Sequence, residues 1–309
     1  MTTKMKSFVK SSVVLGALLV AAGASAEERN VTAGRAELYK QLAPESLETV
    51  STPAQISKLG APNLAPTTIW KVLEHGEKLE CLACVPVVSK LLYNSHPKTR
   101  EIAAWWLRRR IFGVFGPGQV YQQTLNALGD SGETESHRVY AANALGEFLS
   151  MSGVPALSKA VTTDESPKVR VAAVSALERL NSSGANGELA SALGDADENV
   201  QLAALHAATR INSFTSVEAV VGLIGDPSNL VRRRAAETLG VMKAADAVAG
   251  LMVLAAETDE SDAPVRAAAV WALGQIGDPV AADVILAAQH DSDASVRSAA
   301  KVAAALLRL

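Results

Sequence analysis

Apolar and polar positions along this chain follow the period of an amphipathic helix, and the same pattern recurs seven times. Each copy can be aligned on an anchor position that is arginine in six copies of seven. Valine precedes the anchor in five copies, alanine follows it after three residues, and leucine or alanine follows it after seven. These offsets fall on one face of a helix, so every copy predicts an amphipathic helix. The anchors are Arg100, Arg138, Arg170, Gln201, Arg232, Arg266 and Arg297.

The spacing of the copies predicts the architecture. Successive anchors lie 31 to 34 residues apart, except for a first interval of 38. A shorter apolar helix is expected upstream of each anchored helix, as in residues 217–225 and 280–288. Helix N-caps are expected at Ser166, Asp197, Ser228, Asp262 and Asp293. Two antiparallel helices per copy predict an all-α fold, an α-solenoid of about seven helix-pair repeats.

The consensus D-x-x-x-x-V-R-x-A-A-x-A-L-G resembles the short HEAT-like repeat of phycobilisome-lyase-type proteins, and the resemblance covers residues 67–309. It implies a ladder in which an acidic residue, six positions before each arginine, contacts an arginine of a neighbouring repeat. The residues that match this ladder are Asp164, Arg170, Asp195, Asp226, Arg232, Glu260, Arg266, Asp291 and Arg297. Asn94, Gly132 and Gln201 depart from it, so we expect a weaker ladder in the first two repeats and an interruption at Gln201. Because the arginines recur, we interpret them as structural rather than catalytic.

The first 26 residues have the features of a secretory signal peptide. Lys4, Lys6 and Lys10 precede a short apolar stretch at residues 13–22, and Ala24-Ser25-Ala26 fits a signal-peptidase site. We therefore expect cleavage after Ala26 and a periplasmic or otherwise exported protein without stable membrane insertion. An uncleaved N-terminal anchor is the alternative.

Charge narrows the range of partners. Removing the leader takes away three lysines and changes the formal net charge from −3 to −6. A protein that binds nucleic acid without sequence preference needs a basic face, so nucleic acid is not an expected partner.

Residues 27–66 contain four prolines and predict an extended N-terminal arm with one short helix around residues 33–42. The solenoid is then expected over residues 67–309, with an atypical first repeat at 67–126 and regular repeats at 127–309.

The first repeat concentrates aromatic residues: seven of the twelve aromatics that follow the leader lie between positions 70 and 121. Aromatic and arginine side chains often dominate binding interfaces. The predicted partner-binding residues are Trp105, Trp106, Arg108, Arg109, Arg110, Phe112 and Phe115. A capping repeat, whose large side chains close the end of the stack, is the alternative. Adjacent tryptophans on a helix point about 100° apart, so Trp105 and Trp106 are not expected to face the same core.

Cys81 and Cys84 are the two cysteines of the chain. Val85 follows them where a c-type haem requires histidine, and a second metal-binding pair at zinc spacing is not present in the sequence. We expect no metal and no cofactor. In an oxidising compartment a disulfide is the favoured interpretation, and a redox-active pair is the alternative.

The sequence therefore predicts an exported, non-catalytic scaffold or assembly factor that binds a protein partner in the cell envelope. Two alternatives stay open: a thiol–disulfide redox protein that uses Cys81 and Cys84, and a lyase-like protein that binds a small ligand or chromophore. Serine-hydrolase and zinc-protease motifs do not occur in the sequence.

Overall fold

The computed structural model describes residues 50–114, 118–212, 214–256 and 258–309, and within these ranges it is all-α, without strands. The expected leader and the predicted helix around residues 33–42 lie outside the described residues. The chain divides into two compact units, residues 1–85 and residues 86–309. We describe each unit by itself.

In the first unit, two short helices pack through apolar side chains. Its elements are α4 (Pro53–Ser57), the 3₁₀ turn η1 (Lys58–Gly60), α5 (Pro66–His75) and the 3₁₀ turn η2 (Leu82–Cys84). Ile56 of α4 and Leu73 of α5 are fully buried, and the Ser51 hydroxyl donates to the Val72 carbonyl at 2.7 Å. The prediction of an extended arm is therefore wrong for residues 53–60, because this segment is helical and buries Ile56 and Leu59.

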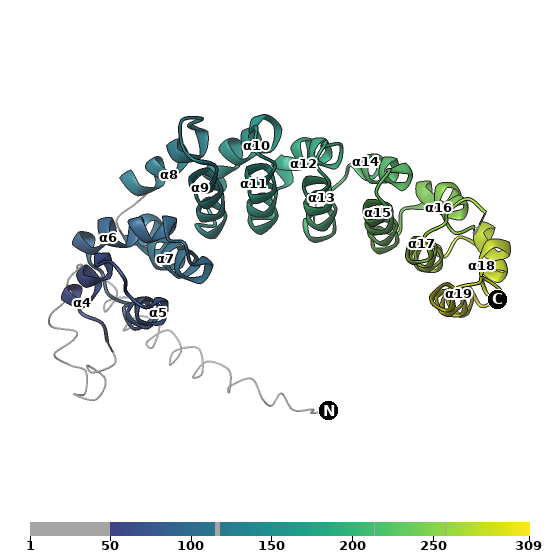
Figure 1. The fold of residues 1–309 in the computed structure, drawn as a ribbon, viewed down its shortest axis with the longest axis horizontal. Coiled ribbons are helices and arrows are strands. Elements are labelled where there is room, and N and C mark those ends of the chain that lie inside the picture. Colours follow the sequence, from purple (N-terminus) through teal and green to yellow (C-terminus); the bar gives the residue numbers. More distant parts are fainter. Residues whose placement is uncertain (1–49, 115–117, 213, 257) are drawn as a thin grey trace, which may run out of the picture. The chain divides into compact units, whose positions relative to one another are not determined.

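The second unit consists of stacked helix pairs, which Figure 1 shows as two rows from α8 onwards. The anchored row, which carries the anchor positions, comprises α7 (Pro97–Arg109), α9 (Glu135–Glu147), α11 (Pro167–Leu180), α13 (Glu198–Arg210), α15 (Asn229–Met242), α17 (Ala263–Ile276) and α19 (Ala294–Leu307). The companion row comprises α6 (Val85–Lys90), α8 (Gln119–Gly129), α10 (Val154–Thr163), α12 (Asn186–Leu193), α14 (Val217–Gly222), α16 (Val248–Leu254) and α18 (Ala282–Ala288). The seven pairs run from α6/α7 to α18/α19, and the prediction of an α-solenoid is confirmed.

The core of this unit follows the repeat pattern. The alanine three residues after the anchor is fully buried in all seven anchored helices, at positions 103, 141, 173, 204, 235, 269 and 300. All five leucines seven residues after an anchor are equally buried, as Leu145 and Leu273 illustrate. Each anchored helix therefore lies between its companion and its neighbours along the stack, with one face left for solvent.

Glycine permits the closest contacts between anchored helices. Gly146, Gly240 and Gly274 each lie eight residues after an anchor. A Cβ atom at Gly274 would lie 2.7 Å from the Cα of Ala303 on the next helix, and one at Gly146 would lie 2.9 Å from the Cα of Ala176. Real Cβ atoms essentially never approach this closely. These contacts exist because the glycines have no side chain.

Candidate functional site

Arginine–carboxylate pairs connect neighbouring repeats at the turns that precede the anchored helices. Arg170 donates from Nε and Nη2 to the two carboxylate oxygens of Asp195, at 2.7 and 2.8 Å. Its Nη1 donates to the carbonyl of Asp164, six residues earlier, at 2.9 Å. Arg170 therefore stabilises the turn that precedes its own helix, and it also binds the turn that precedes the anchored helix of the next repeat. Arg138 pairs in the same way with Asp164, Arg232 with Glu260 and Arg266 with Asp291.

The ladder changes at three places. Gln201 donates a single hydrogen bond to Asp226 at 3.1 Å, in place of the two that arginine makes elsewhere. Arg297 donates to backbone carbonyls of its own turn, and no carboxylate of the described residues lies within ion-pair distance of it. Arg100 lies over the ring of Tyr140, with its Cζ 3.9 Å from the ring centroid. In the second repeat the ladder contact is stronger than expected, because Arg138 donates two hydrogen bonds to the carboxylate of Asp164.

The ladder carboxylates have shifted pKa values. Hydrogen bonds from Arg266 lower the pKa of Asp291, against the opposing effect of burial. Burial would raise the pKa of Asp195, but hydrogen bonds from Arg170 and from the Asp197 amide together lower it. These carboxylates are therefore held as anions that stabilise the stack.

The structure separates the predicted partner-binding residues into buried and accessible ones. Trp106 is fully buried, and Arg110 is 1% exposed with its guanidinium 3.4 Å from a Trp106 ring centroid. Neither side chain can contact a partner directly, which corrects the sequence-based assignment of both. Trp105 and Arg108 are half-buried and Arg109 is exposed.

The phenylalanines of the predicted set have different positions. Phe112 lies in the π-helical segment η4 (Arg110–Val114) and makes edge contacts with Tyr121 and Phe148, at centroid distances of 5.1 and 6.3 Å. These contacts pack Phe112 against the following helix pair, α8 and α9. Phe115 lies outside the described residues.

Cys81 directly precedes the turn η2, and Cys84 is the last residue of this turn, directly before α6. Their sulfur atoms lie 2.09 Å apart and their Cα atoms 5.3 Å apart. Cys84 is fully buried, whereas Cys81 is half-buried. In this arrangement the cross-link closes the turn that leads into α6.

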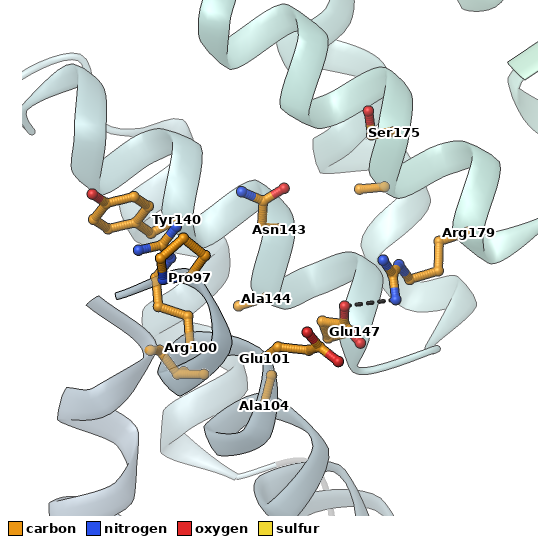
Figure 2. A pocket seen from close by; sticks show the side chains of 12 residues that line it. Pro97, Arg100, Glu101, Ala104, Tyr140, Asn143, Ala144, Glu147, Ser175 and Arg179 are labelled. Carbon is orange, nitrogen blue, oxygen red and sulfur yellow. Dashed lines mark ion pairs between the residues drawn. The ribbon is translucent and has the colours of Figure 1, made fainter. Parts of the chain in front are cut away.

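A groove of about 200 Å³ lies across three anchored helices, α7, α9 and α11 (Figure 2). We call it the α7–α11 groove. Its polar lining comprises Arg100 and Glu101 from α7, Tyr140, Asn143 and Glu147 from α9, and Ser175 and Arg179 from α11. In Figure 2 Arg179 points toward Glu147, and the Arg100 guanidinium lies against Tyr140 at the opposite end.

An ion pair forms the other end of this groove. Arg179 of α11 contacts Glu147 of α9 at 2.6 Å, and Arg108 of α7 donates to the Glu147 carbonyl at 3.4 Å. Burial raises the pKa of Glu147, and the neighbouring Arg179 opposes that shift. Arg108, a predicted partner-binding residue, therefore contacts a residue of the groove without lining it.

A second row of ion pairs continues beyond the groove. Glu178 of α11 contacts Arg210 of α13 at 2.7 Å and His206 at 2.9 Å. Sequence reasoning missed this row and the groove that it borders. The sequence did indicate this row, because a charged residue recurs nine positions after an anchor, at Glu147, Arg179 and Arg210.

The α7–α11 groove is suited to recognition. It offers cations, carboxylates, an aromatic ring, an amide and a hydroxyl on three helices, and arginine and tyrosine are among the residue types enriched at protein interfaces. Within the described ranges, no cluster of three or more His, Cys, Asp and Glu residues could hold a metal ion. No helix in this part of the chain is long and apolar enough to cross a membrane.

Comparison with solved structures shows similar folds at low sequence identity. A chain in a structure of Kap95p bound to RanGDP has a TM-score of 0.62 at 14% identity, over 82% of this chain and 41% of that chain. The protein YibA of E. coli has a TM-score of 0.53 at 17% identity, over 82% of this chain and 96% of its own. A chain in the CpcE–CpcF complex of phycocyanin lyase from Nostoc is 22% identical, over 80% of this chain and 96% of that chain. Its TM-score is only 0.39, so we draw no conclusion from this likeness. These likenesses concern the fold alone.

Comparison of the sequence gives the family. No curated protein matches this chain. The family model for HEAT repeats matches residues 121–187, 186–262 and 222–305, which together span more than half of the chain. The protein therefore belongs to the HEAT-repeat family.

Proposed function

We propose that this protein is an exported, non-catalytic scaffold that binds a protein partner of the cell envelope through the anchored row of its solenoid. The observation that carries the proposal is the α7–α11 groove. It combines residues from three successive repeats, and its ion pair and its stacked arginine are formed between helices of this chain. A preformed surface of this kind loses little conformational entropy on binding.

The accessible residues of the expected partner-binding set support this choice of surface. Trp105, Arg108, Arg109 and Phe112 are the described members of this set that keep some exposure. The first three belong to α7, one of the three helices of the groove, although none of them lines it. We therefore place the main contact surface on α7, α9 and α11 rather than on the buried Trp106 and Arg110.

Filling the groove tests this placement. Ser175 is exposed on α11 within the groove, and Ser191 is exposed on α12 of the companion row. Ser175→Trp should keep the circular dichroism spectrum and melting temperature while it loses the partner in pull-downs from the envelope fraction. Ser191→Trp is the matched control and should retain the partner. Equal partner recovery with both variants would rule out the groove as the contact surface.

Export is the second part of the proposal, and its support is the leader-like sequence of residues 1–26. N-terminal sequencing of the protein from its native cells should find Glu27 as the first residue. An intact leader on protein recovered from the cytosol would contradict export, and it would remove the oxidising compartment that favours the Cys81–Cys84 disulfide.

A further inference from the structure

Arg100 occupies the first arginine position of the ladder, and its own turn holds it as the other ladder arginines are held. Its Nη1 donates to the carbonyls of Asn94 and Ser95, at 2.7 and 3.0 Å. Arg170 makes the equivalent contacts with two carbonyls of its own turn, at 2.9 and 3.2 Å. The Arg100 guanidinium is therefore fixed at one nitrogen in the way that the ladder requires.

The next repeat does not supply a carboxylate for the other two nitrogens of this guanidinium. In four repeats, Nε and Nη2 of the anchor arginine bind a carboxylate that stands six residues before the following anchor. The residue six positions before Arg138 is Gly132, which has no side chain. Across the described ranges, no carboxylate lies within ion-pair distance of Arg100, and its Nε and Nη2 have no hydrogen-bond acceptor. A charged group is thus left with donors that no group of this part of the chain uses.

Arg100 lines the α7–α11 groove, where the other charged side chains are paired. Glu147 contacts Arg179 at 2.6 Å, and Glu101 contacts Lys98 at 2.9 Å. Of the charged side chains that line the groove in the described structure, Arg100 is the one without an oppositely charged neighbour at ion-pair distance. The groove therefore has one cation that an added carboxylate can neutralise.

Tyr140 shields the Arg100 guanidinium from water on one side. The Cζ atom of Arg100 lies 3.9 Å from the centroid of the tyrosine ring (Figure 2). Both side chains are half-buried. A charge that is partly removed from water attracts an opposite charge more strongly than a fully solvated one does. An arginine that two carbonyls and an aromatic ring hold in place also loses little conformational freedom when it binds a carboxylate.

We propose that Arg100 binds an aspartate or glutamate side chain of the partner protein, which supplies the carboxylate that Gly132 does not. Nε and Nη2 donate to its two oxygens, as the other ladder arginines donate to the carboxylates of this chain. Two parallel hydrogen bonds of this kind are the preferred arrangement between arginine and a carboxylate. The inference rests on the proposed function, because it names the chemical group of the partner that the α7–α11 groove binds.

Two short peptides test this chemistry without the partner. The probe is the peptide acetyl-Thr-Asp-Ser-amide, and acetyl-Thr-Asn-Ser-amide is an uncharged control of nearly the same shape. Nuclear magnetic resonance of the ¹⁵N-labelled full chain follows the Nε–Hε signal of Arg100, which Arg100→Gln identifies by removing it. The aspartate peptide should move this signal saturably, with an affinity at least about tenfold higher than that of the asparagine peptide. Its affinity should fall as the salt concentration rises.

A pair of protein variants tests whether the partner uses this arginine. Arg100→Gln removes the two free donors from the groove. Arg297→Gln on α19 is the matched control, because Nη1 of Arg297 also binds two carbonyls of its own turn, at 2.8 Å each. Both variants should keep the wild-type circular dichroism spectrum. In pull-downs from the envelope fraction, Arg100→Gln should recover at least about tenfold less than Arg297→Gln of the partner that Ser175→Trp loses.

The outcomes separate this inference from the proposed function. If Ser175→Trp loses the partner and Arg100→Gln retains it, the groove stands as the contact surface and the carboxylate inference is overturned. Equal affinity of the Arg100 signal for the aspartate and asparagine peptides would overturn it as well. If Ser175→Trp and Arg100→Gln both retain the partner, the proposed contact surface is wrong and the inference fails with it.

Discussion

Replacing Gly274 with alanine tests how closely the anchored helices pack. The added Cβ would lie 2.7 Å from both the Cα and the Cβ of Ala303, so α19 must shift away from α17. Overpacking of this kind costs about 1–3 kcal/mol. Alanine regains about 1 kcal/mol of helix propensity, because glycine is a poor helix former. We therefore expect Gly274→Ala to lower the free energy of unfolding by up to about 2 kcal/mol.

Gly222 is the matched control for this substitution. It lies in α14 with a helical φ of −57°, and a Cβ there would meet nothing within 4 Å. Gly222→Ala should therefore stabilise the protein by about 0.5–1 kcal/mol. Urea denaturation monitored by circular dichroism measures both changes, and the two variants should shift the midpoint in opposite directions. If Gly274→Ala proves as stabilising as Gly222→Ala, the close-packing argument is wrong.

Three further predictions concern the ladder and the cysteines. Gln201→Arg should stabilise the protein by about 1 kcal/mol in the same urea assay, because arginine can make a two-bond contact with Asp226; a loss of stability would contradict the ladder geometry. The folded pKa of Asp291 is lowered by Arg266, so its contribution to stability is present above about pH 5 and is lost as the pH falls through the folded pKa. Asp291→Asn should accordingly flatten the fall in stability below pH 5, and an unchanged slope would refute this contribution. Cys81→Ser should cost about 2 kcal/mol, as a short disulfide loop does, and leave insulin reduction at background level; wild-type reductase activity that this variant loses would favour the redox alternative.

The helical architecture was predictable because the solenoid repeats one local pattern. The alanine and valine positions around each anchor recur on one face, and the expected N-caps Asp262 and Asp293 do accept hydrogen bonds from their helices. Each repeat contacts mainly its neighbours, so local periodicity carries most of the information about the fold. The proline-rich segment was misread for a related reason. Pro53 and Pro66 are the first residues of α4 and α5, where proline favours a helix start, and the interpretation from composition did not use that signal.

The candidate site was less predictable. Trp105 and Trp106 were expected to face different surroundings, and the structure buries the second while it leaves the first half-exposed. The run of three arginines gave no indication that Arg110 folds back onto Trp106, since this contact depends on the π-helical turn that begins at Arg110. The α7–α11 groove depends on side chains from three repeats. Its members are separated by about one repeat length in sequence, so only the stacking of the helices brings them together.

Site-specific photocrosslinking in the native cells tests the proposed binding role most directly. A photoreactive residue at position 175 lies in the α7–α11 groove, and the same residue at position 191 lies on the companion row. The proposal predicts a discrete adduct with one envelope protein from position 175 that position 191 does not give. Identical adduct patterns from the two positions, or no adduct from position 175, would contradict it.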